Sequence, residues 1–135
     1  MMEESAPHRF ETRVYYEDTD LAGIVYYANY LKYIERARTE WVRGLGVDQV
    51  KLKADTGIVF AVSRVEANYT QPGRFDDVLT VTTLPLAATP ARLTLAQAVY
   101  RDHTLLFDAE VTLVAIGADG RPARLPEVIR AKLGT

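Results

Sequence analysis

One long stretch of the chain, from Tyr27 to Leu45, has its apolar side chains at steps of three and four residues. That spacing places them on one stripe of an α-helix, so it predicts a long helix with one buried face. The apolar positions are Tyr30, Leu31, Ile34, Ala37, Trp41, Val42 and Leu45, and the opposite face carries Lys32, Glu35, Arg36, Glu40 and Arg43. Gly44 and Gly46 predict the end of the helix, because glycine commonly occupies the position that follows one.

Most of the remaining chain has the pattern of strands. Residues 9–16 alternate between apolar and polar side chains, which is the period of a half-buried strand. Later segments are rich in β-branched and aromatic residues and are separated by short turns. After the helix, strands are expected at 58–70, 78–84, 92–100 and 105–116, and short helices at 48–54 and 126–133.

This order of elements predicts an α+β domain in which one long helix covers one face of a five- to six-stranded antiparallel sheet. Residues 1–135 form a single expected domain, without a linker, repeat or low-complexity segment. The second face of the sheet and its edges stay uncovered in such a domain. Small domains commonly cover them by pairing with copies of themselves, so we expect a homo-oligomer, at least a dimer, with sites at the seam.

Composition excludes several classes of protein. The chain has no cysteine, which excludes disulfides, thiolate nucleophiles and cysteine-based zinc sites. Its net charge is −2 and its basic residues are dispersed, which does not favour a nucleic-acid partner. No apolar run reaches the ~18 residues of a membrane span, and the N-terminus lacks a secretory signal pattern. We expect a soluble, cytoplasmic protein with no nucleic-acid partner and no membrane span.

Few nucleophilic side chains are present. The serines are Ser5 and Ser63 and the histidines are His8 and His103. Ser5 and His8 fall in an expected N-terminal tail. A serine–histidine–acid triad would therefore pair Ser63 with His103, without the sharp turn that holds a serine nucleophile. The glycine-rich motifs of dinucleotide and P-loop phosphate sites are missing.

A metal site is also not expected. Residues 18–23 have two acids and a glycine in positions that suit a calcium loop, but Ala22 and Asn29 stand where two of its ligands are needed. Carboxylates, tyrosines and backbone groups remain as chemical resources. No cofactor is implied by any of them.

Asp20 precedes the long helix by several residues, so its carboxylate can lie near the unpaired N–H groups of the helix N-terminus. Those N–H groups can bind a developing oxyanion. The alternative is that Asp18 and Asp20 only cap the helix and satisfy the turn. Gly23 also has two explanations: it supplies a positive φ in the turn, or its missing side chain lets a substrate carbonyl approach the backbone.

Other candidate residues have ordinary structural explanations. Most tyrosines of the region are expected in the core or at an interface, with a hydroxyl that reaches a partner. They are Tyr15, Tyr16, Tyr26, Tyr27, Tyr30 and Tyr33. Trp41 is expected in the core. Arg64 and Arg92 are either anion contacts or solvated strand positions.

The motif YYEDTDLAGIVYYANY at residues 15–30 resembles the active-site segment of hotdog-fold acyl-CoA thioesterases of the 4-hydroxybenzoyl-CoA thioesterase family. The following YIERARTE at 33–40 is similar to the Tol-Pal-associated branch of that family. The resemblance continues through FAV at 60–62, RFDDVL at 74–79 and AEV at 109–111, and it covers nearly the whole chain. It implies a hotdog fold, in which an antiparallel sheet wraps the long helix and two subunits join their sheets.

The resemblance also implies roles for individual residues. Asp20 matches the catalytic aspartate, as nucleophile or general base, and Tyr27 matches the position whose backbone N–H polarises the thioester carbonyl. The positions matched to substrate binding are Tyr16, Gly23, Val25, Tyr26, Phe60, Ala61 and Val62, with the last three contributed by the partner subunit. Arg92 lies in the turn that matches the coenzyme A contacts, and Arg64 is the second residue expected to bind coenzyme A. Coenzyme A is part of the substrate, so no separate cofactor is expected.

Two departures from the family pattern affect these assignments. The Tol-Pal-associated branch usually has histidine in place of Tyr27, which leaves only the backbone role there. The turn that meets the nucleotide of coenzyme A carries a single basic residue, Arg92, within residues 88–92. The leading hypothesis is an acyl-CoA thioesterase that forms a dimer or a homotetramer. The alternatives are a non-catalytic acyl-CoA-binding or protein-interaction module, and a dehydratase acting on hydroxyacyl thioesters.

Overall fold

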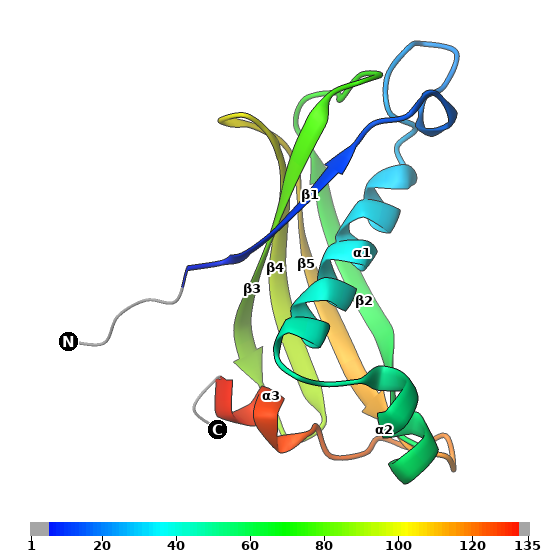
Figure 1. Ribbon diagram of the computed structural model, residues 1–135, viewed down its shortest axis with the longest axis vertical. Coiled ribbons are helices and arrows are strands. Elements are labelled where there is room, and N and C mark those ends of the chain that lie inside the picture. Colours follow the sequence, from blue (N-terminus) through cyan, green and yellow to red (C-terminus); the bar gives the residue numbers. More distant parts are fainter. Residues whose placement is uncertain (1–5, 133–135) are drawn as a thin grey trace, which may run out of the picture.

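The computed structural model of the protein describes residues 6–132, and Figure 1 shows its arrangement. Ser5 and Leu133 lie outside the described residues. The elements in chain order are β1 (His8–Arg13), the short 3-10 helix η1 (Tyr16–Asp18), α1 (Asn29–Gly44), α2 (Gln49–Thr56), β2 (Val59–Tyr69), β3 (Val78–Ala88), β4 (Arg92–Arg101), β5 (Thr104–Ile116) and α3 (Glu127–Lys132). The expected α+β architecture with one long helix is confirmed.

The five strands of the described chain form one antiparallel sheet in the order β1-β3-β4-β5-β2. β4 and β5 form the predicted hairpin. The turn at 71–74 does not form a hairpin, because β2 and β3, which it connects, are not neighbours in the sheet. β2 instead pairs with β5 along almost its whole length, from Val59 opposite Ile116 to Tyr69 opposite Phe107. β2 is therefore an edge strand.

The core lies between α1 and one face of the sheet. The helix contributes an apolar stripe, and alternate side chains of the strands contribute the other half. The buried residues include Tyr30, Tyr33, Ile34, Ala37, Trp41 and Val42 from α1, and Leu79, Val81, Leu93, Leu95, Val99, Phe107, Val111, Leu113 and Ala115 from the sheet. Trp41 is thus a core residue, as predicted. Figure 1 shows α1 lying along this face.

Two predictions about α1 are corrected. The helix begins at Asn29 and not at Tyr27, because Tyr26 and Tyr27 still belong to the loop that leads into it. Leu31 is exposed to 41%. It lies one position after the buried Tyr30, which turns it by about 100° away from the stripe.

The first strand is shorter than predicted, and His8 belongs to it and not to a tail. Residues 14–16 leave the strand because the chain turns there into η1. The Tyr15 N–H donates to the Asp18 carboxylate at 2.8 Å, and the Asp18 N–H donates to the Tyr15 carbonyl at 2.9 Å. This local turn removes Tyr16 from the strand and leaves it 82% exposed.

The second short helix is confirmed as α2. The Asp48 carboxylate accepts the Lys51 N–H at 3.1 Å at its start, and Gly57 ends it at a φ of 77°. β3 extends to Ala88, past the predicted end, with an irregularity in its pairing between Pro85 and Ala87. Within residues 6–132, no helix combines the length and apolar character needed to cross a membrane.

Candidate active site

The chain between η1 and α1 forms a tight turn around Asp20. The Asp20 N–H donates to the Ile24 carbonyl at 2.9 Å, and Thr19 and Val25 form an isolated β-bridge beside it. The Ala22 N–H donates to Oδ1 of Asp20 at 3.0 Å, so the carboxylate also closes its own turn. The side chain is exposed. A carboxylate with one fixed oxygen and access to solvent is available for chemistry.

Gly23 completes this turn. Its φ of 82° is a left-handed conformation that favours glycine, and its N–H donates to the Asp20 carbonyl at 2.9 Å. No atom lies within 4 Å of the place where a Cβ would stand. The turn therefore requires glycine for its backbone conformation, and the space beside it is open.

The N-terminus of α1 lacks a side-chain cap. Its N-cap residue is Ala28, and neither Asp18 nor Asp20 caps it. Asp18 instead accepts the Tyr15 N–H, while its carbonyl accepts from the Tyr26 N–H and from Nδ2 of Asn29, both at 2.9 Å. Among the hydrogen bonds of residues 6–132, none has the Tyr27 N–H as donor. This amide is a free donor at the positive end of a helix dipole.

A hollow of about 310 Å³ lies beside Tyr27. It is lined by Ile24, Val25, Tyr27, Tyr30, Tyr69, Thr70, Gln71 and Pro72. The Tyr69 hydroxyl donates to the Tyr27 carbonyl at 3.0 Å, which ties the end of β2 to the start of α1. Burial raises the pKa of both Tyr30 and Tyr69. These two hydroxyls therefore stay protonated at neutral pH and act as neutral hydrogen-bonding groups.

The other predicted residues of this region lie close by in the chain but differ in burial. Val25 is 3% exposed and forms part of the wall of the hollow. Tyr26 and Tyr27 are exposed and have ring centroids 5.0 Å apart. Tyr16 contacts Phe75 edge-on at 6.4 Å between centroids. Of the six tyrosines expected in a core or interface, only Tyr30 and Tyr33 are buried in the protomer.

Phe60, Ala61 and Val62 are not brought together with Asp20 in one protomer. Phe60 lies nine residues before Tyr69 on β2, which is roughly 30 Å along an extended strand. Phe60 and Val62 line a second, small hollow of about 70 Å³ between β2 and α1. The other residues around it are Glu35, Arg38, Thr39, Val42, Gln49 and Leu113.

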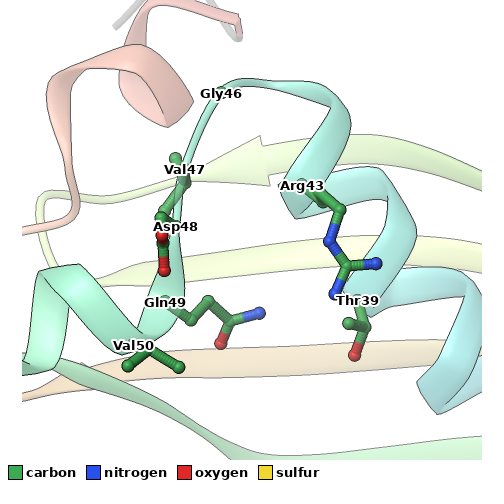
Figure 2. A pocket seen from close by; sticks show the side chains of 7 residues that line it. All are labelled: Thr39, Arg43, Gly46, Val47, Asp48, Gln49 and Val50. Carbon is green, nitrogen blue, oxygen red and sulfur yellow. The ribbon is translucent and has the colours of Figure 1, made fainter.

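A larger hollow, which the sequence patterns did not indicate, lies where α1 ends and α2 begins. It has a volume of about 620 Å³ and shares Thr39 and Gln49 with the small hollow. Figure 2 shows its lining residues, with the side chains of Thr39, Arg43 and Gln49 around one space. It lies at the opposite end of α1 from the Asp20 turn (Figure 1). A helix terminus and a loop form it together, so no single motif indicates it.

Arg64 and Arg92 lie on the other face of the sheet. Arg64 stands opposite Thr112 and Arg92 opposite Val114. Thr112 and Val114 alternate along β5 with buried residues that face α1, so they point to the opposite face. Arg64 is paired with Glu66 at 3.2 Å. Arg92, which is exposed, has no carboxylate within 4.0 Å among the described residues. Neither side chain joins the Asp20 turn within one protomer.

The serine–histidine alternative has no geometric support. Ser63 is level with Thr112 on β5, where its hydroxyl donates to the Thr112 carbonyl at 3.4 Å. His103 lies in the turn before β5, nine residues from Thr112, or roughly 30 Å along the strand. In the part of the chain that the structure describes, no three His, Asp or Glu side chains are grouped closely enough to hold a metal ion.

Comparison with known sequences gives a consistent result. Residues 14–133 match the Thioesterase-like superfamily. The acyl-CoA thioester hydrolase YbgC of Escherichia coli is 37% identical over 126 residues, which cover 92% of this chain and 93% of that protein. The acyl-CoA thioesterase YbgC of Haemophilus influenzae is 34% identical over 123 residues, which cover 90% of each chain.

Solved structures of similar fold include thioesterases. A probable thioesterase from Bartonella henselae superimposes with a TM-score of 0.86 at 35% identity, covering 90% of this chain and all of that one. A 4-hydroxybenzoyl-CoA thioesterase bound to 4-hydroxybenzoyl-CoA superimposes with a TM-score of 0.85 at 23% identity, covering 90% and 95%. The latter likeness concerns the fold alone. The hotdog fold expected from the sequence is confirmed.

Proposed function

This chain belongs to the thioesterase-like superfamily and is an acyl-CoA thioester hydrolase, and we propose that Asp20 and the Tyr27 N–H carry out its hydrolysis. The assignment is supported by the exposed Asp20 carboxylate, which lies in the turn before the uncapped N-terminus of α1. Just before that helix, the Tyr27 N–H has no acceptor among the described residues. A carboxylate can act as nucleophile or general base, and a free N–H can stabilise the oxyanion that forms at a thioester carbonyl. Aspartate, with an unperturbed pKa of ~3.9, is ordinarily ionised at neutral pH.

In the proposed reaction, the thioester carbonyl oxygen accepts the Tyr27 N–H. Two routes then remain open. The Asp20 carboxylate attacks the carbonyl carbon, the C–S bond breaks and an acyl anhydride forms that water hydrolyses. Alternatively, Asp20 takes a proton from a water molecule that attacks the same carbon. Either route ends with the free acid and coenzyme A, whose thiolate takes up a proton. One well-placed oxyanion donor contributes ~2.7–4 kcal/mol to such a step.

We also propose that the site is completed by a second copy of the chain. β2 has one unpaired edge in the protomer and is exposed along most of its eleven residues. Antiparallel pairing of two β2 edges about a two-fold axis places the start of one strand beside the end of the other. The Phe60 and Val62 hollow of one protomer then adjoins the Tyr27 and Tyr69 hollow of its partner. This pairing explains why the predicted acyl-contacting residues are separated in one chain.

Coenzyme A contacts are proposed for Arg92 first and Arg64 second. Arg92 has an available guanidinium, whereas the charge of Arg64 is already shared with Glu66. A homotetramer remains a prediction, and the sheet face opposite α1 would be the surface on which two dimers meet. The cytoplasmic location expected from the sequence likewise remains a prediction.

The Asp20→Asn variant tests the catalytic assignment. It keeps the side-chain oxygen that accepts the Ala22 N–H, so the turn is expected to remain folded. Thiol release from acyl-CoA should fall by about 10²-fold or more, which is the scale of a lost acid–base group. Glu17→Gln removes an exposed carboxylate three residues away and should leave the rate unchanged.

Circular dichroism and chromatographic mass would show that both variants keep their fold. Full activity in Asp20→Asn would exclude Asp20 from the mechanism. Saturable binding of acyl-CoA by the unmodified protein, without thiol release over long incubation, would favour a binding module.

A further inference from the structure

Arg38 is a basic residue held in place on the sheet-facing side of α1. Its Nη1 donates to Oε1 of Gln97 at 3.0 Å. Gln97 is only 1% exposed, and its Nε2 donates to the Ile34 carbonyl and to Oγ1 of Thr83, both at 2.9 Å. The amide of Gln97 is thereby fixed between the helix and β3. One end of the Arg38 guanidinium is anchored to a rigid part of the core.

The remaining donors of Arg38 have no partner in the described part of the protomer. A guanidinium has five N–H groups, and the bond to Gln97 is its only hydrogen bond among residues 6–132. No carboxylate of these residues lies within 4.0 Å of it. Its partial burial lowers the pKa of Arg38, while the more distant charge of Glu35 raises it. A partly desolvated cation with unused donors favours a ligand with an oxygen acceptor, and an anionic acceptor most.

The space beside Arg38 limits the size of such a ligand. The hollow that it shares with Glu35, Phe60 and Val62 measures about 70 Å³. A cavity of ~150 Å³ holds a benzene ring, and this hollow is smaller than that. It suits a small polar group at the end of an acyl chain or ring, and it is too small for a long chain. The ring or chain itself would occupy the 310 Å³ hollow of the partner protomer.

We propose that Arg38 is a specificity residue that selects acyl groups carrying an oxygen acceptor at the end far from the thioester, a carboxylate more strongly than a hydroxyl. This inference rests on the proposed thioesterase function and on the proposed two-fold pairing of β2. A carboxylate can accept two N–H groups of the guanidinium fork in parallel. Glu35 is exposed at the same hollow, and its negative charge repels a carboxylate of the substrate. It thereby reduces the preference for a carboxylate over an uncharged acyl group.

Three aromatic thioesters that differ at one position test the proposal. The three substrates share one ring and one thioester. At the end of the ring far from the thioester, benzoyl-CoA has no substituent, 4-hydroxybenzoyl-CoA has a hydroxyl and 4-carboxybenzoyl-CoA has a carboxylate. For each, kcat/KM is measured by thiol release with the intact protein. The ratio of kcat/KM for 4-carboxybenzoyl-CoA to that for benzoyl-CoA is expected to fall about ten- to hundredfold in Arg38→Met.

Two further variants make the test specific. Arg36→Met removes the same charge from an exposed position of the same helix and should leave the ratio unchanged. Glu35→Gln removes the opposing charge and should raise the ratio. Arg38→Lys keeps the charge without the fork, so its ratio should fall between those of the unmodified protein and Arg38→Met.

The outcomes separate this inference from the proposed function. A fall of the ratio for 4-carboxybenzoyl-CoA that exceeds any fall for 4-hydroxybenzoyl-CoA supports recognition of an oxygen acceptor by Arg38, and a fall for 4-hydroxybenzoyl-CoA alone overturns the preference for a carboxylate. An unchanged ratio in Arg38→Met, or equal losses for all three thioesters, overturns it. If the unmodified protein releases no thiol from any of the three or from aliphatic acyl-CoAs, the proposed function fails instead. Chromatographic mass and the unfolding midpoint of Arg38→Met show whether the residue holds the assembly together, which would also overturn the inference.

Discussion

Asp18 and Asp20 show how two nearby carboxylates acquire different roles through their local hydrogen bonds. Asp18 accepts the Tyr15 N–H and holds the 3-10 turn, so its side chain serves the backbone. The Asp20 carboxylate accepts only the Ala22 N–H among the described residues, and its side chain is exposed. Residue type and spacing alone make the two equivalent as helix caps, yet neither caps α1. Each carboxylate accepts one backbone N–H, and the chemistry is assigned to Asp20 because its side chain is the exposed one.

Gly57 is a residue whose replacement should destabilise the fold. It ends α2 at a φ of 77°, and a Cβ there would lie 2.9 Å from Cβ of Ala118. Gly57→Ala combines a left-handed backbone with this close contact, so the free energy of unfolding should fall by about 1–3 kcal/mol in urea titration. Gly44→Ala is the matched control. It lies in α1 with no atom within 4 Å of the place that a Cβ would take, and it should be neutral or stabilising. Equal losses in both variants would contradict this explanation.

At the scale of the element, α1 contains tyrosines that make stability depend on pH. Burial is the largest cause that raises the pKa of Tyr30 and of Tyr33, and the charge of Asp18 adds to it at Tyr33. The unfolded chain loses these protons near pH 10 while the folded protein retains them. The unfolded state then binds fewer protons, so the free energy of unfolding is undiminished below pH 10 and falls as the pH rises above it.

Urea unfolding at a series of pH values between about 8 and 11.5 checks this sign. Each tyrosine that titrates only in the unfolded state contributes a slope of up to about 1.4 kcal/mol per pH unit. Tyr33→Phe should therefore show a shallower decline above pH 10 than the unmodified protein. Identical slopes would mean that Tyr33 ionises equally easily in both states.

At the scale of the whole molecule, the proposed pairing of two β2 edges predicts that assembly and activity are lost together. Val65 is 41% exposed and lies opposite the buried Val111, on the side of the sheet that faces α1. A charge there is tolerated in the protomer but would be buried in the proposed pair. In Val65→Lys the mass measured by light scattering should therefore fall toward the 15.1 kDa of one chain. Hydrolysis should fall with it, because each site of the proposed pair contains residues of both chains.

Val128→Lys provides a control for this change. Val128 is 42% exposed, which is close to the 41% of Val65. It belongs to α3, which Figure 1 shows apart from β2. This variant should keep both the mass and the activity of the unmodified protein. A monomeric Val65→Lys variant with full activity would show that one chain contains the complete site.

Much of the fold follows from local patterns in the sequence. The 3.6-residue period of α1 and the alternation along the strands depend only on which side chains avoid water, so they are visible without the structure. Element ends are predicted less accurately. The first strand is shorter than its alternation predicts because the Asp18 carboxylate, a local competitor for backbone N–H groups, ends it before Tyr16.

The sequence by itself therefore determined the long helix, the antiparallel strands, the absence of cysteine chemistry and, by resemblance, the acyl-CoA thioesterase family. Only the tertiary structure decided that β2 crosses to the edge of the sheet beside β5, that the Tyr27 amide is left unpaired among the described residues, and that Arg38 and Gln97 meet between helix and sheet. The physical reason is that periodicity reports burial along one element, whereas a site depends on which groups of distant segments are left without a partner once the elements have packed.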